Sequence, residues 1–290
     1  MSRIAIVTGA TRNLGLVLAR TLAQRLAAED FVYLTGRNAD RVAASVACLE
    51  GACAQVVGHA LDVADTDATV RLADAVAERH GGVDVVISNH YYRTDPEDDP
   101  AAVIGPYVAA NNLGTTEILR RFAPLLRNQG RLLVVASRAG SLRALAPALH
   151  SRFDRAETLE DVDRAICAWR DAVLEGRAAG EAWPAWINIP SKVGQVAAVR
   201  ALAAQRREAD LARGILIAAV SPGLIDTGAS RSWLDMAGAR SPEEVGPPIA
   251  DFALQRELDP AHYGALVHLG TPEPMGAFGS LGFGQVVPWR

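Results

Sequence analysis

Residues 4–15 read IAIVTGATRNLG, and this stretch predicts the fold of the chain. Ile4–Val7 is a short apolar, largely β-branched run, which is typical of a buried strand. Helical spacing of apolar residues begins at Leu14–Ala27. Between them, Gly9 permits a tight turn and Gly15 permits close packing at the start of the helix, where free N–H groups suit a pyrophosphate. The stretch therefore predicts a strand–turn–helix unit that binds a dinucleotide.

Strand-like and helix-like segments alternate along the chain after this unit. Five further strands are expected, at Phe31–Thr35, Gln55–Ala60, Val83–Ser88, Arg131–Ala136 and Ile215–Val220. Helical spacing occurs at Arg41–Glu50, Thr66–His80, Thr115–Leu126 and Ser191–Arg213. Continuous apolar strands separated by helices indicate right-handed β-α-β crossovers. We expect an α/β fold, a doubly wound Rossmann-type parallel sheet of about seven strands, in a single domain over residues 1–290.

Two segments depart from the alternation. The stretch Arg143–Trp183 is rich in charge and helical spacing and contains no strand-like run, so we expect a helical insertion after strand five, at about residues 143–183. The proline- and glycine-rich tail, Thr271–Arg290, is expected to pack around the last strand and the site.

Composition restricts the partners and the compartment. Of the 290 residues, 50% are hydrophobic and 21% charged, and the net charge of −4 offers no basic surface for nucleic acid or an anionic membrane. No apolar run approaches the ~20 residues of a membrane span, and MSRIAIVTGA lacks the pattern of a secretory leader. The three cysteines, Cys48, Cys53 and Cys167, form no CxxC pair, which favours a reduced, cytoplasmic compartment. A small-molecule partner is expected.

The end of the second strand predicts which nicotinamide cofactor binds. No acidic residue lies between Val32 and Asn38, where an NAD site usually holds the ribose hydroxyls. Arg37 lies where it can meet a 2′-phosphate, and Arg12 in the first turn is a second clamp, so the pattern favours NADPH. Solvated surface arginines are the alternative interpretation of both. After strand three, Asp62 and Val63 lie where adenine would bind, although an aspartate there also suits a helix N-cap.

In the order of its motifs the chain resembles the short-chain dehydrogenase/reductase family, most of all its carbonyl-reductase-like branch. The motifs are the glycine loop, Leu61-Asp62-Val63, a modified NNAG segment at residues 88–91, Asn111-x-x-Gly114, Ser137, Lys192, Ser221-Pro222-Gly223 and the branch-like segments Ser141–Leu145, Glu181–Pro184 and Ser241–Glu244. The resemblance implies NADPH-dependent carbonyl reduction. It also implies a monomer, because the insertion of that branch covers a surface that other members use to associate.

The resemblance also implies site residues. Asn111 matches the asparagine that holds a water against the lysine, Ser137 the serine that binds the substrate oxygen, and Lys192 the lysine that binds the nicotinamide ribose. The cofactor-binding positions that it implies are Thr8, Gly9, Thr11, Arg12, Asn13, Leu14, Gly15, Arg37, Asp62, Val63, Asn89, Lys192, Pro222, Gly223, Leu224, Ile225 and Thr227.

Three departures from the family pattern are visible. The catalytic tyrosine of the family lies four residues before the lysine, and in this chain Asn188 occupies that position. Bulky His90 and Tyr91 replace the small pair of the NNAG segment. Asn13 replaces the middle glycine of the phosphate loop, and asparagine tolerates a positive φ better than most residues.

The asparagine alters the expected chemistry, because an amide donates a hydrogen bond but does not release a proton. General acid catalysis is worth about 10²–10⁴ in rate. One possibility is a substrate that needs no such acid: an iminium, or a conjugated C=C whose enolate Ser137 and Asn188 stabilise. The resemblance supports it, since branch relatives without the tyrosine reduce alkenes. A second is another donor, namely His90, Tyr91, or Lys192 through water. The third is loss of redox activity.

Our leading hypothesis is an NADPH-dependent reductase of a C=N, conjugated C=C or activated C=O group in a bulky, partly planar small molecule. The alternatives are a non-redox enzyme on the same scaffold (a dehydratase, isomerase or cyclase) and an NADPH-binding protein without turnover. The alanine- and arginine-rich composition, with Lys192 as the only lysine, suggests a GC-rich bacterial genome and specialised metabolism.

Overall fold

The computed structural model describes residues 2–270 and 281–290, and it contains one continuous eight-stranded sheet. The strand order is β3-β2-β1-β4-β5-β6-β7-β8, parallel except for β8, which pairs antiparallel with β7. The strands are β1 (Ile4–Val7), β2 (Phe31–Gly36), β3 (Gln55–Ala60), β4 (Val83–Ser88), β5 (Leu126–Val135), β6 (Leu216–Ser221), β7 (Leu266–His268) and β8 (Val286–Val287). The predicted doubly wound Rossmann-type sheet is confirmed, with eight strands instead of about seven.

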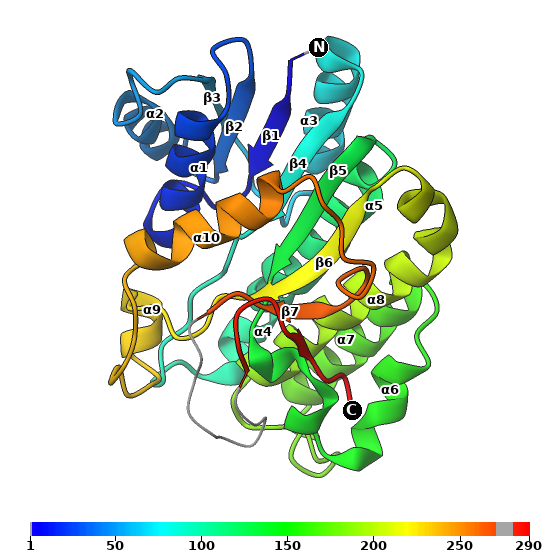
Figure 1. Cartoon of the computed structure of the whole chain (residues 1–290). Helices are drawn as coiled ribbons and strands as arrows, with labels where there is room; N and C mark the ends of the chain where they lie inside the picture. The colour runs from blue at the N-terminus through cyan, green and yellow to red at the C-terminus, as the bar shows by residue number, and fades with distance from the viewer. Residues whose placement is uncertain (1, 271–280) are drawn as a thin grey trace.

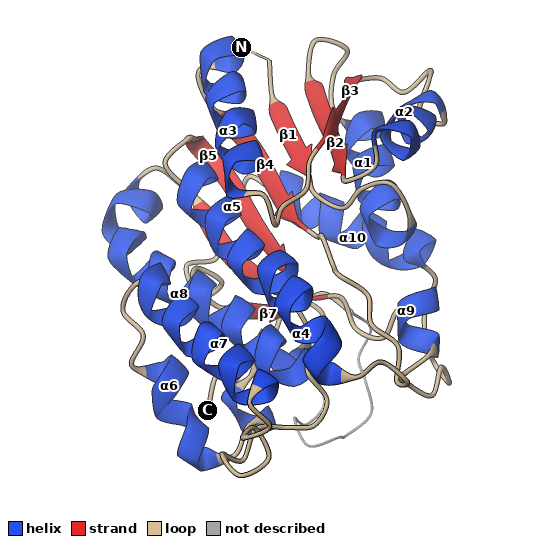
Figure 2. Cartoon of the chain, turned by 180° about the vertical axis from the view of Figure 1, so that it is seen from behind, coloured by secondary structure: helices blue, strands red, loops and turns tan. Residues whose placement is uncertain are grey.

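Helices cover both faces of the sheet. They are α1 (Asn13–Arg25), α2 (Ala39–Ala47), α3 (Thr66–His80), α4 (Pro100–Val108), α5 (Gly114–Phe122), α6 (His150–Asp154), α7 (Leu159–Leu174), α8 (Asn188–Ala212), α9 (Gly228–Arg231) and α10 (Pro242–Leu254). Figures 1 and 2 show α1 and α10 on one face and α3, α5 and α8 on the other. Because both faces are covered, β1 and β6 are buried at every position, as their unbroken apolar sequences predict.

Several element boundaries differ from the sequence prediction. The helix expected at Thr115–Leu126 ends at Phe122, and strand β5 begins at Leu126 instead of Arg131. Helix α4 was not expected. It continues through a π-helical turn, η1 (Ala109–Leu113), into α5, so one long helical segment precedes β5.

Helices and helical turns occupy the region between β5 and α8. Three 3₁₀ turns, at Arg138–Gly140, Leu142–Ala144 and Pro147–Leu149, precede α6 and α7. Helix α7 starts with a capping box made by Thr158 and Asp161, and it packs against α4 and α8. Of the tail, residues 271–280 lie outside the described residues, and the described part contributes β8 beside the last parallel strand.

The sheet topology determines where a site can form. The chain order runs outward from β1 to β3 and then returns to β4 on the other side of β1. Ligands bind outside the carboxyl ends of the strands at such a reversal, because the loops there diverge. In this protein those loops follow β1 and β4. Within the described residues, no helix is both long and apolar enough to cross a membrane.

Candidate active site

A cavity of about 620 Å³ opens at the carboxyl ends of β1, β2, β4, β5 and β6 and at the start of α8. Most of the residues selected from the sequence line it: Gly9, Thr11, Arg12, Asn13, Leu14, Gly15, Arg37, Val63, Asn89, His90, Tyr91, Ser137, Asn188, Lys192, Pro222, Gly223, Leu224, Ile225 and Thr227. Thr8, Asp62 and Asn111 are not among the lining residues. The structure thus brings together residues that are up to 218 positions apart in sequence, from Gly9 to Thr227.

The turn after β1 has the backbone that a phosphate loop requires. Gly9 has a φ of 63°, and Asn13, the first residue of α1, has a φ of 47°, so asparagine does adopt the left-handed conformation expected of it. A Cβ on Gly9 would lie 2.7 Å from the His90 Cα, and one on Gly15 would lie 2.3 Å from the Gly9 carbonyl oxygen. Neither position can carry a side chain without moving backbone, which is why glycine is needed there.

Arginines gather at the β2 end of the cavity. Arg12 and Arg37 are both exposed and line it, and the Arg37 guanidinium lies 5.8 Å from the centroid of the Tyr92 ring. Arg41, in the first turn of α2, lines the cavity as well and was not singled out from the sequence. Asp62 is exposed, and its carboxylate accepts a hydrogen bond from the backbone of Ala64 instead of facing the cavity.

His90 belongs to a buried hydrogen-bond network that leaves it no free nitrogen. Nδ1 lies 2.9 Å from the Thr8 hydroxyl, and Nε2 lies 3.3 Å from the Thr115 hydroxyl. Burial, together with the nearby charge of Lys192, lowers the pKa of His90 to about 4. The imidazole is therefore neutral at neutral pH, which argues against His90 as the replacement proton donor. The sequence had left that option open.

Lys192 is buried at the wall of the cavity and has two hydrogen-bond acceptors. Its Nζ donates to the Gln195 Oε1 at 2.8 Å and to the Val135 carbonyl oxygen at 3.3 Å, and it lies 5.6 Å from the centroid of the Tyr91 ring. Desolvation lowers the pKa of Lys192 to about 8, which is close to physiological pH.

Asn188 lies one helical turn before Lys192 on the same face of α8, as the spacing predicts. Its Oδ1 accepts a hydrogen bond of 3.2 Å from the hydroxyl of Tyr107, a fully buried side chain of α4. The Tyr107 and Tyr91 rings meet edge to face with centroids 6.1 Å apart, and the two hydroxyls share a hydrogen bond. Burial raises the pKa values of both tyrosines.

Ser137, Asn111 and Thr227 lie at different depths relative to the cavity. The Ser137 hydroxyl accepts a hydrogen bond from the Ala139 backbone at the rim of the cavity. Asn111 is buried behind the wall, where its Oδ1 accepts from the Tyr92 backbone at 2.7 Å. The Thr227 hydroxyl accepts from the Ser230 backbone and caps α9.

Aromatic side chains form the outer wall of the cavity. Trp186 and Trp233 stack with ring centroids 5.7 Å apart at 28°, although 47 residues separate them in sequence. Tyr91 and Tyr92 line the same cavity. Trp183, by contrast, is a core residue that packs on Phe153. The wall suits a flat substrate, because planar rings pack against planar rings.

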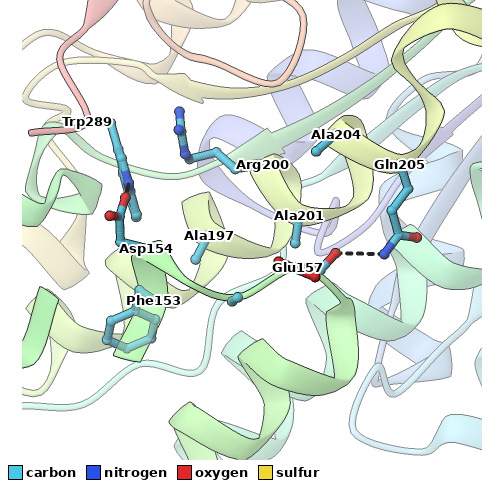
Figure 3. Close-up of a pocket in the computed structure, with 10 residues that line it drawn as sticks. Phe153, Asp154, Glu157, Ala197, Arg200, Ala201, Ala204, Gln205 and Trp289 are labelled. Carbon is cyan, nitrogen blue, oxygen red and sulfur yellow. Dashed lines mark hydrogen bonds between the residues drawn. The ribbon is translucent and has the colours of Figure 1, made fainter. Parts of the chain in front are cut away.

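A second cavity, of about 370 Å³, lies between α6, α8 and the C-terminal segment (Figure 3). Its floor is made by alanines of α8, and the Arg200 guanidinium lies 4.8 Å from the centroid of the Trp289 ring. Gln205 donates a hydrogen bond to the Glu157 carbonyl oxygen there. None of its lining residues is shared with the first cavity.

The comparisons with known proteins agree with the fold. Residues 3–148 match the family described as short chain dehydrogenase. Carbonyl reductase (NADPH) 1 of Macaca fascicularis is 30% identical over 252 residues, which are 83% of this chain and 87% of that protein. Carbonyl reductase (NADPH) 3 of Mus musculus is 30% identical over 257 residues, covering 84% and 87%. The chain belongs to the short-chain dehydrogenase family.

Solved structures show the same fold at lower identity. Salutaridine reductase from Papaver somniferum superposes with a TM-score of 0.77 at 20% identity, covering 91% of this chain and 99% of that one. Menthone neomenthol reductase from Mentha piperita gives a TM-score of 0.72 at 18% identity, with coverages of 92% and 99%.

Sequence reasoning missed several residues of the site. Gln195 is three positions after Lys192, and that helical spacing places both on one face, so this partner was accessible from sequence. Tyr107, Arg41 and Trp233 carried no comparable signal, because each reaches the site from an element whose position depends on the folded chain.

Proposed function

We propose that this protein is an NADPH-dependent reductase that adds hydride to a conjugated C=C or an activated C=O group of a bulky, partly planar small molecule. One observation carries the proposal above others. A single cavity runs from the glycine turn of β1 and its arginines to Lys192 and Asn188, so cofactor and substrate share one space.

The residues present fit a reduced nicotinamide dinucleotide phosphate. Gly9 and Gly15 leave the backbone of the first turn uncovered, and the N-terminus of α1 suits the pyrophosphate. Arg12, Arg37 and Arg41 would hold the 2′-phosphate. The names of the carbonyl reductase relatives, which specify NADPH, favour the same cofactor. When bound, it supplies a hydride.

The residues of this chain would stabilise the negative charge that hydride addition creates on the substrate oxygen. The Ser137 hydroxyl, the Asn188 amide and the Lys192 ammonium all line the cavity and can donate hydrogen bonds to an oxyanion or enolate. The aromatic wall made by Trp186, Trp233 and Tyr91 would orient a flat substrate and exclude water.

The charges around the cavity favour some of these electrophiles over others. Among the described lining residues none is acidic. Arg12, Arg37 and Arg41 are assigned to the 2′-phosphate and Arg93 pairs with Asp95, which leaves the Lys192 charge for the substrate. An iminium would enter this environment as a cation with no carboxylate to balance it. A conjugated C=C or a C=O group enters neutral and becomes negative, and the Lys192 ammonium stabilises that negative charge. We therefore place C=N reduction behind these two reactions.

The first test is a fluorescence titration of the purified protein with NADPH and with NADH. We expect tighter NADPH binding, and we expect Arg37→Ser to weaken it roughly tenfold to a hundredfold while leaving NADH binding unchanged. Arg20→Ser is the matched control, because Arg20 lies on α1 outside the cavity and pairs at 4.0 Å with Glu243. Absence of binding by either nucleotide would remove the redox proposal.

A substrate screen then separates the reactions. NADPH consumption is followed with conjugated enones, activated ketones and cyclic iminium salts of similar size. We expect turnover with enones or activated ketones. Product formation without NADPH consumption would indicate a non-redox enzyme instead.

A further inference from the structure

The side-chain amide of Gln195 bridges Lys192 and the π-helical turn η1. Its Oε1 accepts from the Lys192 Nζ at 2.8 Å, and its Nε2 donates to the Asn111 carbonyl oxygen at 2.8 Å and lies 3.2 Å from the Thr115 hydroxyl. Gln195 is 2% exposed, so no solvent competes for these bonds. Each of the two amide atoms therefore has a buried partner.

The chemistry of these partners fixes the orientation of the amide. An ammonium is only a donor and a backbone carbonyl is only an acceptor, so the flipped amide would face two mismatched groups. The Thr115 hydroxyl donates to the same Asn111 carbonyl at 2.8 Å. Its lone pairs are then available to the His90 Nε2 and the Gln195 Nε2, and the His90 Nδ1 in turn accepts from the Thr8 hydroxyl.

This arrangement leaves one N–H of the ammonium for the cavity, where the nicotinamide ribose that the lysine of the family binds would lie beside the substrate oxygen. Two of its three N–H groups point to Gln195 and Val135, and the side chain lines the cavity beside the Tyr91 ring. The titratable groups that face it are His90 and Tyr91, both from the loop after β4, whereas the contacts from β5 and α8 are uncharged. His90 is neutral, and the Tyr91 hydroxyl is engaged with Tyr107 and Thr94.

We propose that Lys192 itself delivers the proton to the substrate oxygen, and that Gln195 is the positioning residue that aims it. This inference rests on the proposed reductase function and deepens it. The amide of Asn188 and the hydroxyl of Ser137 donate hydrogen bonds in the same cavity but keep their protons. Lys192 is thus the cavity group with a transferable proton and a fixed direction.

In the proposed step, hydride addition to the substrate precedes proton transfer from Lys192. Hydride from the reduced nicotinamide forms a new C–H bond, the π bond opens, and its electron pair comes to lie on the substrate oxygen. The oxygen then takes a proton from Nζ, and the electron pair of the broken N–H bond stays on the nitrogen. The neutral amine of Lys192 regains a proton from solvent. A ketone gives an alcohol directly, and an enone gives an enol that tautomerises to the saturated ketone.

The experiment uses the fact that Lys192 is the only lysine of the chain. Protein labelled with ¹³C-lysine, without a lysine-containing tag, gives one side-chain signal by NMR, and its pH titration reports the Lys192 pKa directly, without cofactor or turnover. The same pH range is then covered by kcat/KM for the best electrophile of the screen.

For the wild-type protein we expect a midpoint near pH 8 and a kcat/KM that falls above that pH, as the ammonium is lost. Gln195→Leu removes the acceptor and should lower both midpoints by roughly one unit, whereas Gln195→Glu adds a negative partner and should raise both. Gln205→Leu, the same change on the same helix at the second cavity, should move neither (Figure 3).

Lys192→Arg provides the complementary variant, because a guanidinium keeps the charge but does not release a proton. We expect it to lower kcat by about 10²–10⁴ and to abolish the fall of kcat/KM at high pH. A Lys192 midpoint that is unchanged in both Gln195 variants would overturn the positioning role. If the Lys192 midpoint measured by NMR moves in the Gln195 variants but the midpoint of the fall in kcat/KM at high pH does not, the donor role of Lys192 would be overturned. Failure of every electrophile to consume NADPH, with normal Lys192 titrations, would instead refute the reductase function and the donor role with it.

Discussion

At the residue scale, the buried His90 of the active-site network makes the free energy of unfolding depend on pH in the acid range. In the folded protein its pKa is lowered from 6.5 to about 4, because burial disfavours the charged imidazolium and the nearby Lys192 charge repels it. Below pH 6.5 the unfolded chain therefore binds a proton that the folded chain excludes, and stability falls as the pH drops towards 4. The stabilisation is fully present above pH 6.5 and amounts to about 3 kcal/mol.

We expect His90→Gln to remove this contribution to the pH dependence. Between pH 7 and pH 4, the free energy of unfolding should fall by about 3 kcal/mol less in the variant than in the wild-type protein, as measured by urea denaturation. His150→Gln, at a half-buried histidine outside the network, is the control. Equal losses in wild type and His90→Gln would show that His90 is not neutral in the folded protein.

Asn188 determines how well an ordinary ketone can react. It occupies the family position of the acid, and the amide donates hydrogen bonds without releasing a proton. Asn188→Tyr places a phenol one helical turn before Lys192, whose ammonium lowers a phenol pKa. We expect the variant to add a second acid to the one that Lys192 supplies, and to reduce a simple aryl ketone faster than the wild-type protein, followed as NADPH consumption.

Asn188→Phe is the matched control, because it adds the same ring without the hydroxyl. Similar ketone rates for the tyrosine and phenylalanine variants would mean that Tyr91 and Tyr107, which pack beside this position, already exclude a productive phenol.

At the element scale, the sequence predicts those turns and strands whose conformation depends on their own residues. The turn Gly9–Gly15 and the apolar runs of β1 and β6 were identifiable because backbone freedom and burial on both sheet faces leave direct traces in residue type. Asn13 was recognised as a residue that can replace glycine for the same reason, and its φ of 47° confirms it.

Elements that depend on tertiary context were harder to predict. Helix α4 contains Pro106 and continues into the π-helical turn η1, and neither feature has a strong periodic signal. Yet η1 places the Asn111 carbonyl where Gln195 and Thr115 both bind it. Strand β8 has two residues, too few for an alternating pattern to be visible.

The residues of the candidate site also divide into those that the local sequence indicates and those that only the folded chain brings together. Residues at strand ends, such as Arg37 and Ser137, line the cavity, because parallel strands all point their carboxyl ends to one edge. Trp233 was not selected from the sequence, since the loop after β6 brings it to Trp186 only in the folded chain. Asp62 was placed in the cavity by motif order, but its carboxylate caps a local turn.

At the scale of the whole molecule, the packing of α7 bears on association. Helix α7 lies against α4, α5 and α8, on the face of the sheet seen in Figure 2. Among the described residues, the large hydrophobic side chains that are exposed are Leu174, Leu234, Phe283 and Val286, which belong to three separate segments. A stable dimer needs roughly 800 Å² per partner with an apolar centre, which four scattered side chains do not supply.

We therefore expect a monomer in solution. Light scattering behind size exclusion should give a mass close to the 30.7 kDa of one chain at micromolar concentration. Leu174, the last residue of α7, is an exposed large hydrophobic residue of that helix, and Leu174→Asp should leave the mass of a monomer unchanged. A mass of about two chains that Leu174→Asp reduces to one would place a subunit interface on α7. In that case α7 would form the subunit interface itself, instead of covering a surface through which subunits could associate.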